Sequence, residues 1–123
     1  MKQKIIGSYE CGFDVIQLVG REGSGGEFYS IPGDINYPRI KVGLDQESFS
    51  LLLEALLHEV YEYELHKCGL RTRRTDSISC DHANYMFVFD HRQFAEVTAR
   101  CAEFLEKALP DTRKAWKKWN KNK

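Results

Sequence analysis

Residues 51–69 read LLLEALLHEVYEYELHKCG, and this stretch decides the fold. Its apolar side chains return every three or four positions, the spacing that gathers one face of an α-helix. They are Leu51, Leu52, Ala55, Leu56, Val60 and Tyr63. The helical period begins after Asp45, and Gly69 is a typical residue for a helix C-terminus. The sequence therefore predicts one long, largely apolar helix between these two residues.

Before this helix, the pattern is typical of β-strands. Residues 13–19, 27–31 and 39–44 are rich in β-forming side chains, and turn-forming glycines and prolines lie between them. Three short strands joined in this way favour an antiparallel meander. The run GSGG at residues 23–26 lacks the Lys-Ser/Thr ending of a phosphate-binding loop. We interpret it as a hairpin connection.

After the helix, residues 71–82 are polar and basic and are predicted to form an exposed loop. Residues 85–89 read YMFVF, which is too aromatic for a loop and too short for a helix, so a fourth strand is expected. Asp90, with Gln93 three residues later, matches a capping box. A second helix should therefore begin there and run to about Leu109.

Pro110 is expected to end that helix, because proline lacks a backbone N–H. Residues 111–121 would then form a short third helix. A chain of 123 residues has room for one core. We therefore expect a single α+β domain over residues 1–110 and a basic helical tail over residues 111–123. That tail contains six Lys/Arg and one Asp, a local charge of +5 in a chain whose net charge is zero.

The sequence contains no run of about 18 apolar residues that could span a bilayer. Its first residues lack the apolar stretch and small-residue cleavage site of a signal peptide. We therefore expect a cytoplasmic protein with no membrane partner. The four cysteines are widely separated and form no C-x-x-C pair; they are Cys11, Cys68, Cys80 and Cys101. In a reducing compartment all four are expected to be free thiols.

His58 and Glu62 are four residues apart, so a helix projects them side by side. Their stripe also contains Leu51, Ala55 and Leu65. These apolar neighbours favour an inward orientation, and a buried carboxylate needs a cation or a proton. The pair could therefore share a metal ion. Glu59 lies about 100° round the helix, turned away from direct coordination but near the rim, where a general base would act.

The alternative is an acidic, solvated helix that holds no metal. Four glutamates support it: Glu54, Glu59, Glu62 and Glu64. On this interpretation His58 is simply hydrogen-bonded in the core.

The segment LLHEVYE at residues 56–62 resembles the H-E-x-x-E core of small zincin-like proteins encoded by bacteriophages and prophages. The segment DHRQF at residues 90–94 is similar to the H-x-x-I/F step that opens the next helix in that family. The resemblance implies that His58, Glu62 and His91 bind Zn²⁺ and that Glu59 is the base.

The same resemblance, which covers residues 50–109, implies a zincin-like domain and a hydrolase of peptide or other amide bonds that uses metal-activated water. A phage-encoded chain would act in the host cytoplasm. The usual metallopeptidase signature has His where Glu62 stands, although glutamate is also a zinc ligand.

Two alternatives concern the ligands. His82 could replace His91 as the third ligand of the helix site. A separate closed zinc site could form from the mirrored runs HKC at residues 66–68 and CDH at residues 80–82, since two thiolates and two imidazoles suit tetrahedral zinc. Its one-residue spacing is unfavourable, because H-x-C does not point both side chains the same way.

Residues 113–121 read RKAWKKWNK, which interleaves cations with indoles and could bind a phosphate backbone or an acidic protein surface. Trp116 and Trp119 are three apart, so both are expected to pack on the domain while the lysines stay exposed. Two hypotheses follow. The first is a zinc-dependent hydrolase whose peptide or protein substrate aligns along residues 39–44. The second is a non-catalytic protein that binds a host factor or nucleic acid, with a structural metal or none.

Overall fold

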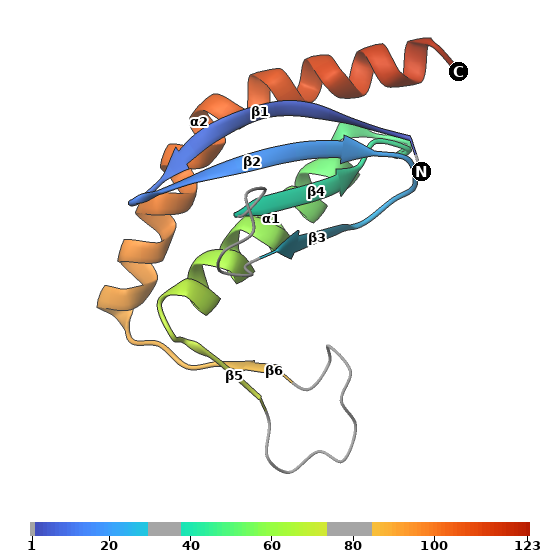
Figure 1. The fold of residues 1–123 in the computed structure, drawn as a ribbon. Coiled ribbons are helices and arrows are strands. Elements are labelled where there is room, and N and C mark those ends of the chain that lie inside the picture. Colours follow the sequence, from blue (N-terminus) through green and yellow to red (C-terminus); the bar gives the residue numbers. More distant parts are fainter. Residues whose placement is uncertain (1, 30–37, 74–84) are drawn as a thin grey trace.

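The computed structural model describes residues 2–29, 38–73 and 85–123. Within them the chain forms a four-stranded sheet, a helix, a short two-stranded hairpin and a long C-terminal helix (Figure 1). The elements are β1 (Gln3–Cys11), β2 (Asp14–Arg21), β3 (Gly26–Tyr29), β4 (Arg39–Gly43), α1 (Phe49–Lys67), β5 (Arg71–Arg73), β6 (Tyr85–Phe87) and α2 (His91–Lys121). The expected α+β class is therefore confirmed, with two helices in the described residues instead of three.

The sheet is mixed, so the predicted antiparallel meander is wrong. Its order is β1-β2-β4-β3, and β4 is parallel to β2 and antiparallel to β3. The connection at residues 22–25 crosses the end of β4 and is bonded to it, from Gly43 N to Gly25 O at 2.8 Å. It is therefore not a hairpin connection. Strand β4 fills the gap between the two strands that this connection joins.

Strand β1 was not predicted. Its sequence QKIIGSYEC has a glycine at its centre, and its register with β2 shifts between Ile5 and Gly7. Such a bulge interrupts the alternation on which strand prediction depends. Gly12, with φ of +65°, then makes the tight turn into β2.

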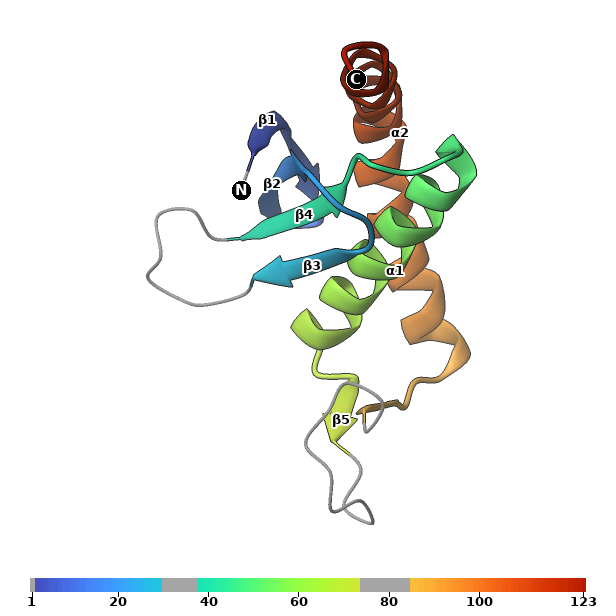
Figure 2. The same ribbon diagram turned by 90° about the vertical axis from the view of Figure 1, so that its right-hand side faces the viewer.

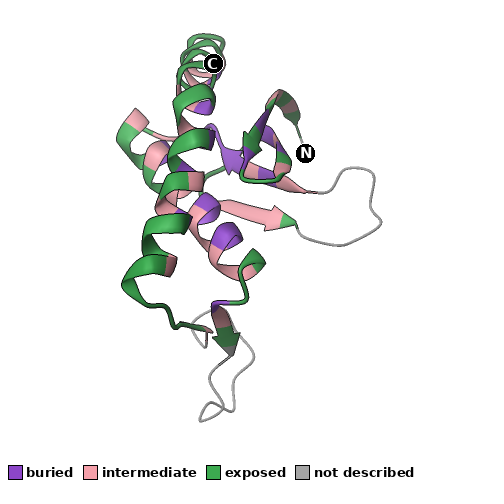
Figure 3. Ribbon diagram, turned by 90° about the vertical axis from the view of Figure 1, so that its left-hand side faces the viewer, coloured by how far each residue is buried: buried purple, intermediate pink, exposed green. Residues whose placement is uncertain are grey.

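The core lies between the sheet and the two helices (Figure 2), and buried positions gather where the strands meet them (Figure 3). The strands contribute Tyr9, Cys11, Ile16, Leu18, Ile40 and Val42. The helices contribute Leu52, Leu56, Val60, Tyr63, Val97, Cys101, Phe104 and Ala108. One face of the sheet thus carries most of the apolar burial that stabilises the domain.

Helix α1 confirms the prediction from its sequence. Ser48 is its N-cap and accepts a hydrogen bond from Leu51 N at 3.4 Å. At the other end, Gly69 has φ of +74° and its N–H bonds back to His66 O, as at a glycine-terminated helix.

Helix α2 begins as predicted but does not end at Pro110. Its capping box consists of two hydrogen bonds. Gln93 N donates to Asp90 Oδ1 at 2.8 Å, and Asp90 N donates to Gln93 Oε1 at 2.9 Å. The helix continues past Pro110 to Lys121, and in Figure 1 it bends partway along its length. The predicted separate third helix over residues 111–121 is therefore wrong.

Tertiary contacts explain this continuation. The Trp116 indole donates to Gln46 O at 3.1 Å, and the Trp119 indole donates to Asp45 Oδ1 at 2.8 Å. These bonds anchor the last turns to the domain and offset the one backbone hydrogen bond that Pro110 removes. The prediction that both tryptophans pack on the domain is confirmed.

Two short strands follow α1 and precede α2. Residues 71–73, predicted as loop, form β5 and pair antiparallel with β6, which confirms the first three residues of the strand predicted at 85–89. The rest of the predicted polar loop lies outside the described residues. The expectation of free thiols is confirmed for Cys11, Cys68 and Cys101, whereas Cys80 also lies outside the described residues.

Candidate metal site

Helix α1 carries three side chains that could hold a metal ion. His58, Glu59 and Glu62 each offer a ligand atom, and these atoms all lie within 4.8 Å of one another. His58 Nε2 is 3.0 Å from Glu62 Oε2, as the i,i+4 spacing predicts. Among the described residues, no other group of three or more His, Cys, Asp or Glu side chains converges in this way.

The His58–Glu62 pair does not face the interior, contrary to the prediction. The His58 side chain is 68% exposed and that of Glu62 is 17% exposed. The prediction failed because Leu51, which was counted with the buried stripe, is 44% exposed. The stripe borders the core, so a cation bound there would keep part of its hydration.

Glu62 uses its two oxygens for different partners. Oε2 faces His58, whereas Oε1 accepts a hydrogen bond from Arg71 Nη1 at 3.0 Å. The Arg71 guanidinium lies over the Phe28 ring at 5.2 Å and over the Tyr85 ring at 4.3 Å, both favourable cation–π contacts. Strand β5 thus supplies a cation, fixed between two rings, that orients Glu62.

Glu59 is buried, at 7% exposure, beside its exposed neighbour His58. Strand β3 packs closely against it, because a Cβ at Gly26 would come within 2.9 Å of Glu59 Cγ. The sequence placed Glu59 at a rim, turned away from coordination. The structure instead brings its carboxylate into the same group as His58 and Glu62.

A hollow of about 360 Å³ opens beside this group. Helix α1 lines it with Glu54, Ala55, His58 and Glu59, and the connection from β2 to β3 lines it with backbone at residues 24–26. A small ligand could therefore reach His58 and Glu59 from solvent.

The other predicted ligands that the structure describes are not brought to this group. His91 is the exposed first residue of α2 and lies outside the cluster of ligand atoms. His82 lies outside the described residues, as does the CDH half of the alternative closed zinc site. Of the HKC half, His66 packs beside the Phe28 ring, with centroids 5.9 Å apart, and burial lowers its pKa. The Cys68 sulfur accepts a hydrogen bond from Arg100 at 3.2 Å.

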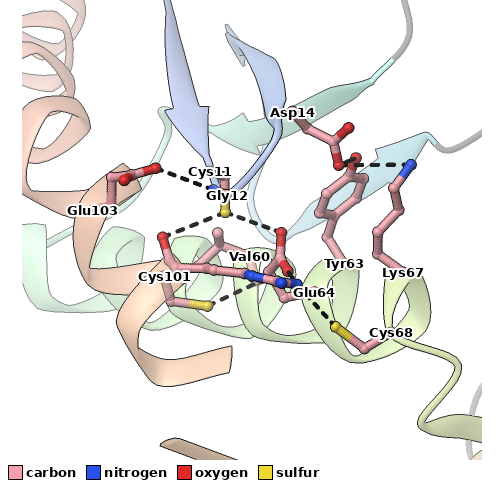
Figure 4. A network of polar contacts seen from close by, with 11 residues as sticks. Cys11, Gly12, Asp14, Val60, Tyr63, Glu64, Lys67, Cys68, Cys101 and Glu103 are labelled. Atoms are coloured by element: carbon pink, nitrogen blue, oxygen red, sulfur yellow. Dashed lines mark hydrogen bonds and ion pairs between the residues drawn. The ribbon is translucent and has the colours of Figure 1, made fainter. Parts of the chain in front are cut away.

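A second polar cluster, which was not predicted from the sequence, lies between α1, α2 and the β1–β2 turn (Figure 4). Glu64 is only 1% exposed and accepts hydrogen bonds from the Cys11 thiol at 3.2 Å and from Arg100 at 3.4 Å. Burial and the charge of Glu64 raise the pKa of Cys11, and burial raises the pKa of Cys101 to about 12. The burial of Glu64 could have been predicted, because Glu64 is four residues after Val60 and therefore continues the buried stripe.

Comparisons with known proteins give no family for this chain: no protein-family model, curated protein or solved structure matches it. Neither helix of the described residues contains an apolar stretch of the length that a bilayer requires.

Proposed function

We propose that this chain is a minimal zincin-like, metal-dependent hydrolase that holds its cation through His58 and Glu62 and uses Glu59 as general base. The observation that carries the proposal is the convergence of three ligand atoms within 4.8 Å beside an open hollow. The resemblance of residues 56–62 and 90–94 to phage-encoded zincin-like proteins supports it. A peptide or another amide is the substrate class that this resemblance implies.

The donor set fits Zn²⁺ better than the hard cations. An imidazole nitrogen together with carboxylate oxygens suits zinc, whereas Ca²⁺ and Mg²⁺ prefer sites made of oxygen alone. Zinc bonds of about 2.0–2.2 Å in a tetrahedron place neighbouring ligand atoms about 3.3 Å apart. The His58 Nε2 to Glu62 Oε2 distance of 3.0 Å requires only a small adjustment to reach that spacing.

The residues of the site have distinct roles. His58 and Glu62 hold the ion, and Arg71, bonded to the other oxygen of Glu62, keeps that carboxylate oriented. A zinc ion supplies Lewis acidity and lowers the pKa of water to about 7. Glu59 accepts the proton of the attacking water and delivers it to the leaving amine. Catalytic zinc sites normally have three protein ligands. The candidates for the third position are His91, which lies outside the cluster in this structure, and His82, which lies outside the described residues.

The substrate is proposed to lie along β3. Strand β4 was expected to provide the edge, but it pairs with β2 on one side and with β3 on the other. Among the described residues β3 is one of the two edge strands of the sheet, and its first residue, Gly26, lines the hollow beside Glu59. An extended peptide that adds to this edge by backbone hydrogen bonding would pass in front of the site.

Metal content tests the proposal directly. After reconstitution with zinc and dialysis, untagged protein should retain about one equivalent by elemental analysis, and His58→Ala and Glu62→Ala should lose it. Glu54→Gln is the matched control, since this exposed carboxylate lines the same hollow but lies outside the cluster. Wild type with less than about 0.1 equivalent would contradict the site. His91→Ala and His82→Ala identify the third ligand. Of these two variants, only the one that removes the third ligand should release the metal.

Activity separates a catalytic from a structural ion. Glu59→Gln should keep its zinc and lose the hydrolysis of a fluorescein-labelled casein substrate, because the general base is removed while the ligands stay. Zinc retention by both proteins, with no hydrolysis by wild type, would leave the metal site standing and would contradict the hydrolase. That result is the one that the non-catalytic alternative expects.

A further inference from the structure

A basic surface lies between β1 and the C-terminal half of α2, at the opposite edge of the sheet from β3. Two hollows of about 360 and 320 Å³ open there, and both are lined by Lys4 and Lys118. Lys2 lines the first hollow and Lys114 lines the second. In Figure 1 the last turns of α2 run alongside β1, so lysines of the strand and of the helix contribute to one surface. We call these four lysines the basic groove.

Three acidic residues line the same hollows, Glu22, Asp45 and Asp111, and each accepts a hydrogen bond within the molecule. Asp45 accepts a hydrogen bond from the Trp119 indole at 2.8 Å and pairs with Lys123, and these contacts hold its pKa well below the usual range. Asp111 accepts a hydrogen bond from the Tyr9 hydroxyl at 2.7 Å. Asp45 and Lys123 both line the first hollow and neutralise each other, and the four lysines of the groove outnumber the two remaining carboxylates, Glu22 and Asp111.

The lysines of the groove keep their charge available. Within residues 2–29, 38–73 and 85–123, Lys4, Lys114 and Lys118 take part in no ion pair. The Lys2 ammonium lies 5.0 Å from the centre of the Trp119 ring, a contact that leaves its charge unneutralised. The Glu22 carboxylate nearby accepts the backbone N–H of Lys2 at 3.2 Å.

We propose that the basic groove binds the phosphate backbone of a single nucleic-acid strand. Lys114 and Lys118 are one helical turn apart, about 6 Å along the axis, which is comparable to the separation of adjacent phosphates on an extended strand. Lys4 lies across the groove from them. Lysines are strongly hydrated point charges that attract phosphates without reading bases, so the binding has no sequence preference.

The shape of the surface favours a strand over other polyanions. Two recessed hollows in a row can follow a flexible backbone, whereas a bilayer presents a broad, flat surface. An acidic protein interface normally adds a buried aromatic or arginine anchor. The indole of the groove, Trp119, already packs on the domain and donates its N–H to Asp45.

Fluorescence anisotropy with a labelled 20-nucleotide single-stranded DNA of mixed sequence tests the proposal. Affinity should fall as salt rises, with a slope of log K against log salt of about −2 to −3 for three to four phosphate contacts. The double variant Lys114→Gln/Lys118→Gln should bind about tenfold more weakly in 0.1 M KCl and have a slope smaller in magnitude by about 1.4. Circular dichroism should show an unchanged fold, because both lysines are exposed.

A control variant separates the groove from net charge. Lys107→Gln/Lys117→Gln removes the same charge from exposed positions of the same helix that line neither hollow. It should change the affinity less than about twofold, since only screened long-range attraction is lost. An equal loss in both double variants would overturn the proposal, as would absence of binding at 50 mM KCl. Tighter binding to vesicles containing phosphatidylserine, or to poly-glutamate, would assign the groove to another class of partner.

Discussion

Glu62 and Glu64 are two residues apart on α1, and each pairs with an arginine, yet their surroundings are opposite. Glu62 bonds to Arg71 at one edge of the helix, where His58 is 68% exposed and a hollow opens beside Glu59. Glu64 is 1% exposed and bonds to Arg100 and the Cys11 thiol, between α2 and the β1–β2 turn (Figure 4). The same charge chemistry thus gives an open site on one side of the helix and a closed junction on the other.

The difference follows from what covers each side of α1. Helix α2 packs over the side that carries Val60 and Glu64, where Cys101 lies against the Val60 carbonyl. On the side that carries His58 and Glu59, the described residues that approach are strand β3, the glycine-rich connection and Gln46. A ligand can enter and leave the hollow beside His58 and Glu59. Glu64 is 1% exposed in its ion pair with Arg100, so the loss of that pair affects stability. We therefore expect Glu64 to serve stability and Glu62 to serve binding.

Truncation of the two carboxylates is the largest expected effect. Glu64→Ala removes the ion pair with Arg100 and one of the two acceptors of the Cys11 thiol at a position that is 1% exposed, and should lower the free energy of unfolding by about 3 kcal/mol. Glu62→Ala should cost about 1 kcal/mol, because His58 is 68% exposed and Arg71 keeps its contacts with the Phe28 and Tyr85 rings. Urea denaturation followed by circular dichroism measures both. Equal losses of unfolding free energy in the two variants would show that Glu62 and Glu64 contribute equally to stability.

Zinc should produce the complementary result. A ligand that binds only the native state at one hundred times its Kd raises the free energy of unfolding by about 2.7 kcal/mol. Thermal unfolding should show this increment in wild type and also in the destabilised Glu64→Gln, but not in His58→Ala. An increment that persists in His58→Ala would place the zinc elsewhere in the chain.

Alkaline pH should destabilise the closed side of α1. Burial raises the pKa of Cys101 from 9.0 to about 12 and also raises the pKa of Cys11. Between these limits the native thiol stays protonated while the unfolded thiol ionises, so stability is complete below pH 9 and falls as pH rises. The loss should be about 1 kcal/mol per pH unit for each buried thiol.

Urea midpoints between pH 8 and pH 10 measure this loss. Cys101→Ala should have a shallower decline than wild type. Val97→Ala is the matched control, since it truncates a buried residue of the same helix without removing a titrating group. If Cys101→Ala and Val97→Ala decline equally, the buried thiol is not the cause.

Local signals predicted most elements of the fold. The capping box of Asp90 and Gln93 and the glycine stop at Gly69 depend on neighbouring residues, and both are present. The parallel pairing of β2 with β4 and the passage of α2 through Pro110 depend on distant contacts, such as the Trp116 bond to Gln46. No periodicity in the sequence records such contacts, so these features were missed.

The site was predicted to a similar degree and for the same reason. Helical spacing brought His58 and Glu62 together correctly, because four residues make about one turn. The predicted stripe was not extended from Val60 to Glu64, and it included Leu51, which is 44% exposed, so the burial of Glu64 and the exposure of His58 were both misjudged. The role of Arg71 depends on the β5–β6 pairing, which local sequence did not indicate.

The smallest expected effect concerns the contact that shapes the open side. In Gly26→Ala the new methyl group would come within 2.9 Å of Glu59 Cγ and 3.0 Å of the Lys41 carbonyl oxygen. The buried Glu59 side chain and the β4 backbone at Lys41 must both shift, so the free energy of unfolding should fall by about 1 kcal/mol. That displacement moves the proposed base and should reduce hydrolysis strongly while zinc content is kept. Elemental analysis, thermal unfolding and the casein assay on one preparation separate the three quantities. Parallel loss of stability and activity would mean that strand β3 supports the fold and does not position the base.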